Sequence, residues 1–153
     1  MHPKYKIKSN PELVFVKFNK DDHIDPLYSL LVKRSHNISH QDVPTKGDHR
    51  KFCLSNQYRF WYLIYQDLEL VGTFYISKEN AIGIQIIDEF CYLNKPVLKF
   101  ILDSFKPRKP VPSIVPPYFF CNIAPDHSSL IEAAKELNGD KCQVTYRFEK
   151  IKE

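Results

Sequence analysis

The sequence predicts an α/β (α+β) fold built on a mixed, mostly antiparallel sheet, and three observations lead to this prediction. Three strand patterns lie between residues 59 and 87 with only tight turns between them, which is typical of an antiparallel meander. After residue 88 the pattern changes to strand, helix and strand, and such a crossover makes its two strands parallel. The 153 residues match the length of one domain, so we expect residues 1–153 to form it, with its core over 12–150.

The first third of the chain is expected to supply one strand and two helices. Residues 12–18 are β-branched and aromatic, which indicates a strand. Asp21 and Asp22 are candidate caps for a helix over 23–34, in which apolar residues recur at helical spacing. Beyond a polar loop, Thr45 is expected to cap a second, short helix.

The rest of the chain alternates between strands and helices. Strands are expected over 59–66, 70–77, 81–87, 118–124 and 142–150, and helices over 96–105 and 127–137. The strand over 81–87 is apolar on both faces, so it should lie inside the sheet. If this strand and the one over 118–124 are neighbours, ligands should collect where the crossover helix begins.

Residues 106–117 carry five prolines. One interpretation is a stiff surface connector, because proline-rich segments are semi-rigid spacers. The alternative is a polyproline ligand for a partner domain.

Composition and charge restrict the class of protein. Hydrophobic residues make up 43% of the chain and aromatic residues 14%, which excludes a disordered polypeptide. The net charge of +4 favours a polyanionic ligand only mildly. No apolar segment resembles a signal peptide or approaches the roughly 20 residues of a membrane span. We therefore expect a cytoplasmic protein with no membrane partner.

The cysteines and histidines do not form a recognisable metal or disulfide pattern. Cys53, Cys91, Cys121 and Cys142 contain no C-x-x-C pair, so we expect buried, reduced thiols. His36 and His40 supply fewer ligands than a metal site needs, and no metal is expected. Nucleic acid is not expected either, because the aromatic strand over 59–66 is apolar on both faces and so indicates a buried position.

Two segments resemble the GNAT superfamily of acyl-CoA-dependent N-acetyltransferases. LVGTFYISKENAIGIQI, residues 70–86, is similar to the family's central hairpin, in which a strand with a medial glycine turns into the cofactor strand. FFCNIAPDHSSLIEAAKELNG, residues 119–139, resembles the family's fifth strand and the N-x-x-S helix after it. The resemblance in element order extends from residue 12 to residue 150.

The resemblance implies a sheet with helices on both faces, in which the fourth and fifth strands of the family splay apart to admit the pantetheine arm of acetyl-CoA. The implied cofactor-binding residues are Gln85, Ile86 and Ile87 on the strand, Asn94, Lys95 and Val97 at the next helix, and Asn122, Ser128 and Ser129 across the cleft. A backbone N–H of the strand would polarise the thioester, and orphan amides at the helix start would hold the pyrophosphate.

The phosphate-binding segment departs from the family's pattern. Residues 91–97 contain no glycine, whereas the family usually has a Q/R-x-x-G-x-G/A loop there. Pro96 also removes one N–H donor, and Lys95 would have to replace lost amides with a point charge. The tyrosine that often acts as an acid on the following helix would fall at Ala134.

Amine acylation requires a neutral amine, so a base near the cleft is useful. Glu89 is the first candidate catalytic residue and Asp88 the second, although a solvated acidic pair at a strand end explains them equally well. Candidate substrate-binding residues are His36, His40, Tyr58 and Arg59.

These residues lead to one expected function and one alternative. The expected function is the transfer of an acetyl group from acetyl-CoA to the amine of a small molecule, with an amino sugar suggested by a faint similarity to GNAT-like proteins of bacterial polysaccharide modification. The alternative is a catalytically degenerate GNAT-like module that binds a ligand or a protein. The resemblance is also compatible with a homodimer.

Overall fold

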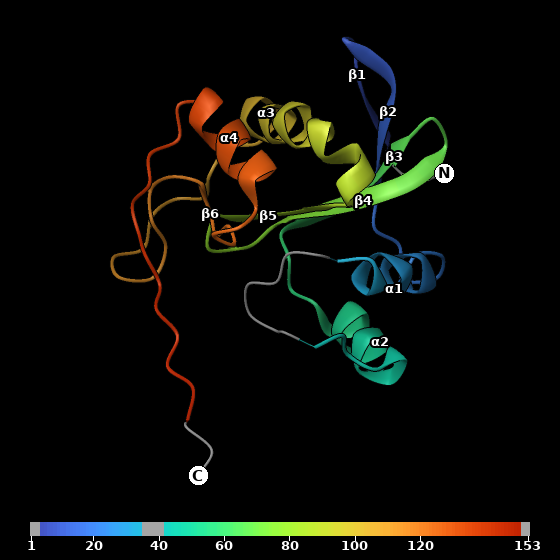
Figure 1. Cartoon of the computed structure of the whole chain (residues 1–153), viewed down its shortest axis with the longest axis horizontal. Coiled ribbons are helices and arrows are strands. Elements are labelled where there is room, and N and C mark those ends of the chain that lie inside the picture. The colour runs from blue at the N-terminus through green and yellow to red at the C-terminus, as the bar shows by residue number, and fades with distance from the viewer. Residues whose placement is uncertain (1–3, 35–41, 151–153) are drawn as a thin grey trace.

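The computed structural model describes residues 4–34 and 42–150, which form one six-stranded sheet with helices on both faces (Figure 1). The strands lie in chain order, from β1 at one edge to β6 at the other. Their bounds are β1 Lys4–Ile7, β2 Asn10–Lys17, β3 Phe60–Gln66, β4 Glu69–Ile76, β5 Ala81–Ile86 and β6 Phe120–Cys121. Neighbouring strands are antiparallel except β5 and β6, which are parallel.

Two helices cover each face of the sheet. On one face lie α1 and α2, and on the other lie α3 and α4 (Figure 1). The bounds are α1 Ile24–Val32, α2 Lys46–Ser55, α3 Asn94–Ser104 and α4 Ser128–Glu136, and a 3-10 helix, η1, spans Asp88–Leu93. The predicted mixed, mostly antiparallel fold with helices on both faces is confirmed.

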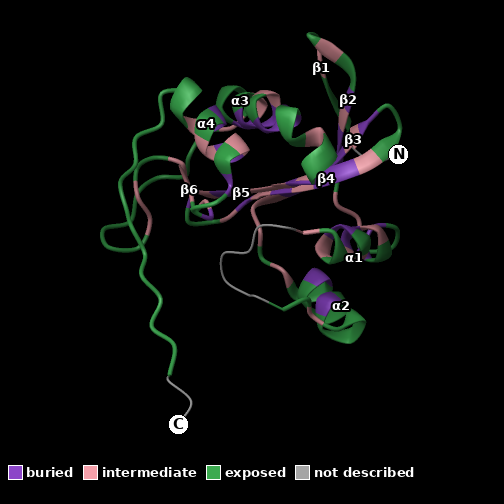
Figure 2. Ribbon diagram, in the orientation of Figure 1, coloured by how far each residue is buried: buried purple, intermediate pink, exposed green. Residues whose placement is uncertain are grey.

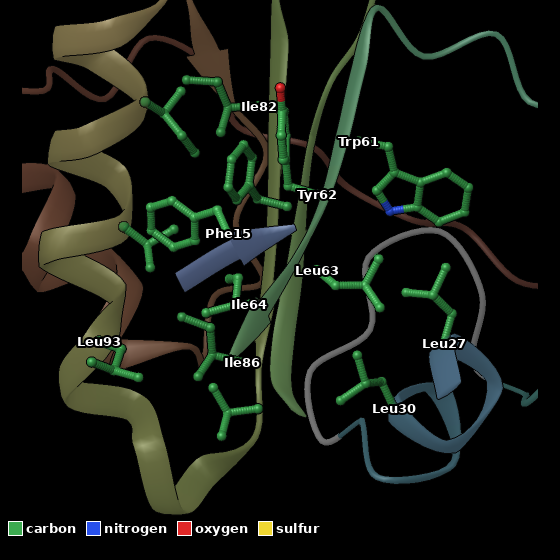
Figure 3. Close-up of a cluster of buried hydrophobic side chains, with 14 of the residues drawn as sticks. Phe15, Leu27, Leu30, Trp61, Tyr62, Leu63, Ile64, Ile82, Ile86 and Leu93 are labelled. Atoms are coloured by element: carbon green, nitrogen blue, oxygen red, sulfur yellow. The ribbon is translucent and has the colours of Figure 1, made fainter. Parts of the chain in front are cut away.

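Alternating side chains along the central strands form a core on each side of the sheet. Figure 3 shows Phe15, Ile64 and Ile86 on the side of α3, whereas Leu63 lies on the side of α1. The buried residues follow the strands and the inward faces of the helices (Figure 2). Trp61 and Tyr62 of β3 are also buried in this core.

The first two helices begin differently, because a side chain caps α2 but none caps α1. The predicted cap of α2 is confirmed, because the Thr45 side chain accepts a hydrogen bond from the Asp48 N–H at 3.1 Å. The predicted aspartate caps of α1 are wrong. The N-cap is His23, whose Nδ1 accepts a hydrogen bond from the Asn19 N–H at 2.8 Å.

Asn80 attaches the proline-rich segment to the turn between β4 and β5. Its side chain is fully buried, accepts a hydrogen bond from the Arg108 N–H at 2.7 Å and donates to the carbonyls of Arg108 and Pro116. A bridge between Val111 and Val115 closes a turn within the segment. A straight polyproline helix is incompatible with this turn, so the segment is a connector that is fixed at both ends.

Four features differ from the sequence-based expectations. The strand β1 was not expected, and residues 88–93 form a 3-10 helix where a loop was expected. The strand expected over 118–124 has only two paired residues. Residues 142–150 are extended and exposed but pair with no strand among the described residues.

The cysteines are free in the structure, but burial was predicted correctly only for one of them. Cys53 is buried and Cys121 is partly buried, whereas Cys91 and Cys142 are exposed. Within the described ranges, no helix has the length and apolar character needed to cross a membrane.

Candidate functional site

The parallel strands β5 and β6 separate after two residue pairs. Ala81 is paired with Phe120 and Ile82 with Cys121, and there the ladder ends. The strand β5 continues beside β4 as far as Ile86. The last four residues of β5 therefore have a strand neighbour on one side only.

The direction of hydrogen bonding shows which backbone groups of β5 face this gap. The Ile87 N–H donates to the Val71 carbonyl, and the Ala81 carbonyl accepts from Ser77, so odd-numbered residues bond toward β4. Because backbone groups alternate along a strand, Ile84 and Ile86 direct theirs toward the gap. This differs from the expectation that the backbone of Gln85, Ile86 and Ile87 would all face the cleft.

Gly83 lies where the gap opens, and the ring of Tyr75 covers it. A Cβ atom at Gly83 would overlap that ring, and it would lie 2.7 Å from the Tyr75 hydroxyl oxygen. The absence of a side chain at residue 83 therefore allows Tyr75 of β4 to lie directly against β5. The phenol reaches the mouth of the gap from the face that carries α1 and α2.

Tyr75 belongs to a partly buried group of aromatic and thiol side chains. Its ring stacks on that of Tyr58, with 4.0 Å between centroids and 3° between planes. Burial raises the pKa of Tyr75, and the nearby Cys121 thiol adds to that rise. Burial also raises the pKa of Cys121 to about 12. These groups therefore remain protonated and uncharged at neutral pH.

The junction between η1 and α3, at the far end of β5, is closed by its own hydrogen bonds. The backbone is helical at Leu93 and Asn94, so η1 runs directly into α3. The Asn94 N–H donates to the Cys91 carbonyl, and Pro96 has no N–H. The start of α3 therefore offers fewer free amides than an isolated helix end.

The Asn94 side chain is also engaged in this junction. It is 1% exposed and donates to the Cys91 carbonyl and to the Ser129 hydroxyl, at 2.9 and 3.1 Å. Its Oδ1 atom is buried without a hydrogen-bond partner. Two residues expected to bind the cofactor thus contact each other and tie α3 to α4.

The charged side chains near the η1–α3 junction do not form a cluster of positive charge. Lys95 forms an ion pair with Glu136 at 2.8 Å, and both side chains are about half exposed. Asp88 and Glu89 are exposed in the first turn of η1. Acidic residues there occupy the positive end of the helical segment and would repel a phosphate.

The remaining predicted residues lie apart from one another. The Gln85 side chain donates to the Leu30 carbonyl of α1 at 2.7 Å, and Val97 is fully buried in the core. Asn122 follows β6 directly, Ser128 is the first residue of α4, and both are exposed. Arg59 donates to the Lys106 carbonyl at 2.7 Å.

Two predicted substrate-binding residues, His36 and His40, lie outside the described residues. Among the residues that are described, the structure brings together no group of three or more side chains suited to hold a metal ion.

Solved structures resemble this chain over most of its length. RimL, a ribosomal L7/L12 alpha-N-protein acetyltransferase in complex with coenzyme A, has a TM-score of 0.58 and 16% identity, with 86% of this chain and 82% of RimL covered. The chain has the fold of the GNAT acetyltransferases.

Two further GNAT structures extend this comparison. An acetyltransferase from Salmonella typhimurium that modifies the N-terminal serine of the same ribosomal protein has a TM-score of 0.53 and 15% identity over 85% of this chain and 81% of its own. An aminoglycoside acetyltransferase from an uncultured soil metagenomic sample, in complex with sisomicin, has a TM-score of 0.54 and 11% identity over 92% of this chain and 97% of its own. The sequence itself matches no family model and no curated protein.

Sequence reasoning missed two residues beside the gap of this GNAT fold. Tyr75 and Cys121 were not among the candidates, although a glycine within a strand, such as Gly83, often marks a close approach of another group to the backbone. The register of β4 and β5 pairs Tyr75 with Gly83, and that pairing is the feature from which the tyrosine could have been inferred.

Proposed function

We propose that this chain is an acyl-CoA-dependent N-acetyltransferase that acts on the amine of a small molecule. The proposal rests on one observation, the separation of β5 and β6 after Ile82. The separation leaves the strand-edge groups of Ile84 and Ile86 available to a pantetheine arm, which carries amides of its own. Bound acyl-CoA would supply the thioester that the amine attacks.

The backbone of β5 would orient the acyl group and stabilise negative charge on its oxygen. An N–H of Ile84 or Ile86 that faces the gap is fixed by the β4–β5 ladder. A fixed donor that faces developing charge needs no reorganisation during the reaction, which is the basis of oxyanion stabilisation. Of the three strand residues predicted to bind the cofactor, only Ile86 keeps a proposed role in holding the acyl group.

Tyr75 is the proposed hydrogen-bond donor to the departing thiolate. Its hydroxyl lies at the mouth of the gap, and its raised pKa keeps the phenol protonated. The amine must lose a proton during the transfer, and Glu89 or Asp88 remains the proposed base. Both carboxylates are exposed, so each can pass a proton to water.

The acceptor is proposed to approach from the face that carries α1 and α2. Tyr58 and Tyr75 form an aromatic wall there, and Trp61 donates to the Thr73 hydroxyl at 2.9 Å. Aromatic rings with polar tips suit a ligand that is partly apolar and partly hydroxylated, and an amino sugar belongs to that class. The acetyltransferases of similar fold act on a protein N-terminus or on an aminoglycoside.

The test combines binding with turnover. Acetyl-CoA at millimolar concentration is expected to raise the melting temperature, because a ligand that binds the native state stabilises it. Thiol release with a panel of amines, which includes amino sugars and N-terminal peptides, then identifies the acceptor class. Binding without thiol release for any amine would contradict the transferase proposal.

A second candidate function is a non-catalytic module with the same fold. The closed junction between η1 and α3 favours it, because that junction lacks the free amides that a diphosphate needs. Unchanged melting with both acetyl-CoA and acetyl-pantetheine would support this second function.

A further inference from the structure

We propose that the connector, residues 106–117, is a docking surface for an acidic and partly apolar segment of another protein. The connector presents aliphatic side chains at its tip and cationic side chains beside them. This inference goes beyond the proposed function and does not depend on it.

The connector is a long excursion from the sheet. The helix α3 ends at Ser104 and β6 begins at Phe120, whereas connections in compact domains usually have roughly 4–6 residues. Figure 1 shows this part of the chain as a loop beyond the β6 edge of the sheet. Loops longer than about 12–15 residues are uncommon in such domains, and many of them bind a ligand or a partner.

The conformation of the connector is fixed although its side chains are exposed. At its base, the Arg59 guanidinium donates to the Lys106 carbonyl at 2.7 Å, and Asn80 holds both backbone groups of Arg108. At its tip, the Val115 N–H donates to the Val111 carbonyl at 2.8 Å. A surface that is already ordered loses little conformational entropy when a partner binds, so this rigidity favours binding.

The tip of the connector exposes aliphatic side chains. Val111 and Ile114 are exposed by 44% and 68%. The Ile114 N–H donates to the Val111 carbonyl at 2.9 Å, so the two residues lie in the same turn. Exposed apolar side chains that lie together with polar residues around them are typical of an interaction site.

The charge beside the tip is positive. Lys106, Arg108 and Lys109 are exposed, and none of the three forms an ion pair within the described part of the chain. Residues 104–125 contain no acidic residue. The β4–β5 turn that holds the connector adds one charge of each sign, Lys78 and Glu79. A net positive surface of this kind is complementary to an acidic partner.

An acidic polypeptide fits these features better than a nucleic acid does. The five prolines of the connector have no N–H, and the N–H groups of Arg108, Val111 and Ile114 are bonded within the fold, so few amides are free to bind phosphates. The tip is aliphatic, whereas proteins that bind single strands stack the bases on aromatic rings. Apolar side chains with charged groups around them are the usual composition of a protein–protein interface.

The experiment measures binding of the full chain to a labelled peptide of four Glu-Leu-Glu repeats by fluorescence anisotropy. We expect saturable binding with a dissociation constant of about 10–100 µM, which is typical of a small interface. Because exposed charges contribute, binding should weaken by about tenfold between roughly 50 and 500 mM salt.

Two variants test the cations and the apolar tip separately. Lys106→Gln/Arg108→Gln/Lys109→Gln is expected to weaken binding of the peptide by about tenfold, and Ile114→Ser by about 3- to 10-fold. The matched control is Lys46→Gln/Arg50→Gln/Lys51→Gln, which removes two lysines and one arginine from α2, apart from the connector (Figure 1), and should change binding by less than about twofold. All these side chains are exposed, so the melting temperatures should stay close to that of the wild type.

Four outcomes would contradict the proposal. They are no saturable binding of the peptide, an equal loss in the α2 variant, equal binding of a peptide of four Glu-Ser-Glu repeats, and an unchanged affinity in Ile114→Ser. Tighter binding to an oligothymidine of similar charge, or to phosphatidylglycerol vesicles, would assign the surface to a nucleic acid or to a membrane and would also overturn it.

Discussion

The gap between β5 and β6 and the junction between η1 and α3 both lie beside β5, but they differ in hydrogen bonding. Backbone groups lack a strand partner in the gap and are bonded within the fold at the junction. Along the gap, the groups of Ile84 and Ile86 have no strand neighbour. At the junction, the Asn94 N–H is already bonded to the Cys91 carbonyl. The strand-edge groups of the first region have no strand partner, whereas the second region already uses the Asn94 N–H within the fold.

Acyl-CoA has two parts that a protein can recognise separately, an amide-containing pantetheine arm and a diphosphate. A strand edge recognises an amide-containing arm through paired hydrogen bonds. A helix start recognises phosphates through free N–H groups and the helix dipole. The gap and the junction therefore favour binding of an acyl-CoA donor mainly through its pantetheine arm rather than through its diphosphate.

The largest effect is expected from Gly83→Val. The added side chain overlaps the Tyr75 ring, so we expect a stability loss of about 1–3 kcal/mol and complete loss of the acetyl-CoA melting shift. Gly47→Ala is the matched control, because the nearest atom to a Cβ there is 3.9 Å away. Donor binding that persists in a folded Gly83→Val protein would show that the gap is not the donor site.

Tyr75→Phe tests the hydroxyl at the mouth of the gap. We expect kcat to fall by about 100-fold, as for loss of a positioned proton donor, with little change in the KM for acetyl-CoA. Tyr65→Phe removes a hydroxyl whose pKa is also raised by burial but which lies on β3, two strands from β5. Equal losses in both variants would assign the effect to packing.

The buried thiols predict a loss of stability at alkaline pH. Burial raises the pKa of Cys121 to about 12 and that of Cys53 to about 11, above the roughly 8.5 of an unfolded cysteine. The folded protein therefore keeps protons that the unfolded chain releases, and stability present below about pH 8 is lost as pH rises through the folded values. Melting temperatures between pH 8 and 11 should fall less steeply in Cys121→Ala than in the exposed control Cys142→Ala.

Opening the junction should help only donors that carry a diphosphate. Asn94→Gly with Pro96→Gly removes the tie to Ser129 and restores one N–H. We expect acetyl-CoA to bind about 3- to 10-fold more tightly, the effect of roughly one hydrogen bond. Calorimetry with acetyl-pantetheine should show no change, and an equal gain for both donors would contradict the separation of the two regions.

The smallest effect is expected from Lys95→Ala. The lysine is half exposed and paired with Glu136, so its loss should weaken acetyl-CoA binding by less than about 3-fold. Lys99→Ala, on the same helix, removes a similar exposed pair with Asp103 and serves as the control. A tenfold loss in Lys95→Ala alone would show that the lysine binds the diphosphate.

The sequence predicted the central meander and the parallel crossover because their patterns are local. Short runs of apolar residues and the two tight turns between them define β3, β4 and β5, and Thr45 caps α2 as expected. The helical residues 88–93 have no comparable pattern, since a 3-10 turn depends on few side-chain preferences. The strand β1 does alternate lysines with Tyr5 and Ile7, but its four residues are at the lower limit of the length over which alternation indicates a strand.

The candidate site was less predictable because it depends on register and pairing. Whether Ile86 or Ile87 faces the gap is decided by which of them bonds to β4, and a one-residue difference reverses the answer. Residues 142–150 do have the alternation of a strand, yet they pair with no strand among the described residues. An alternating apolar pattern indicates that a segment can form a strand, but it does not indicate which strand it pairs with.

The hydrogen bonds of Asn80 have a consequence for the acyl group. This residue fixes the β4–β5 turn, the connector and, through its carbonyl, the first residue of β6. The strands β5 and β6 are therefore held together at the end near Asn80. The separation between them can widen only if the angle between the two strands changes. In the proposed transferase, a longer acyl chain would then have to lie beyond Ile82, on the side of the separation away from Asn80.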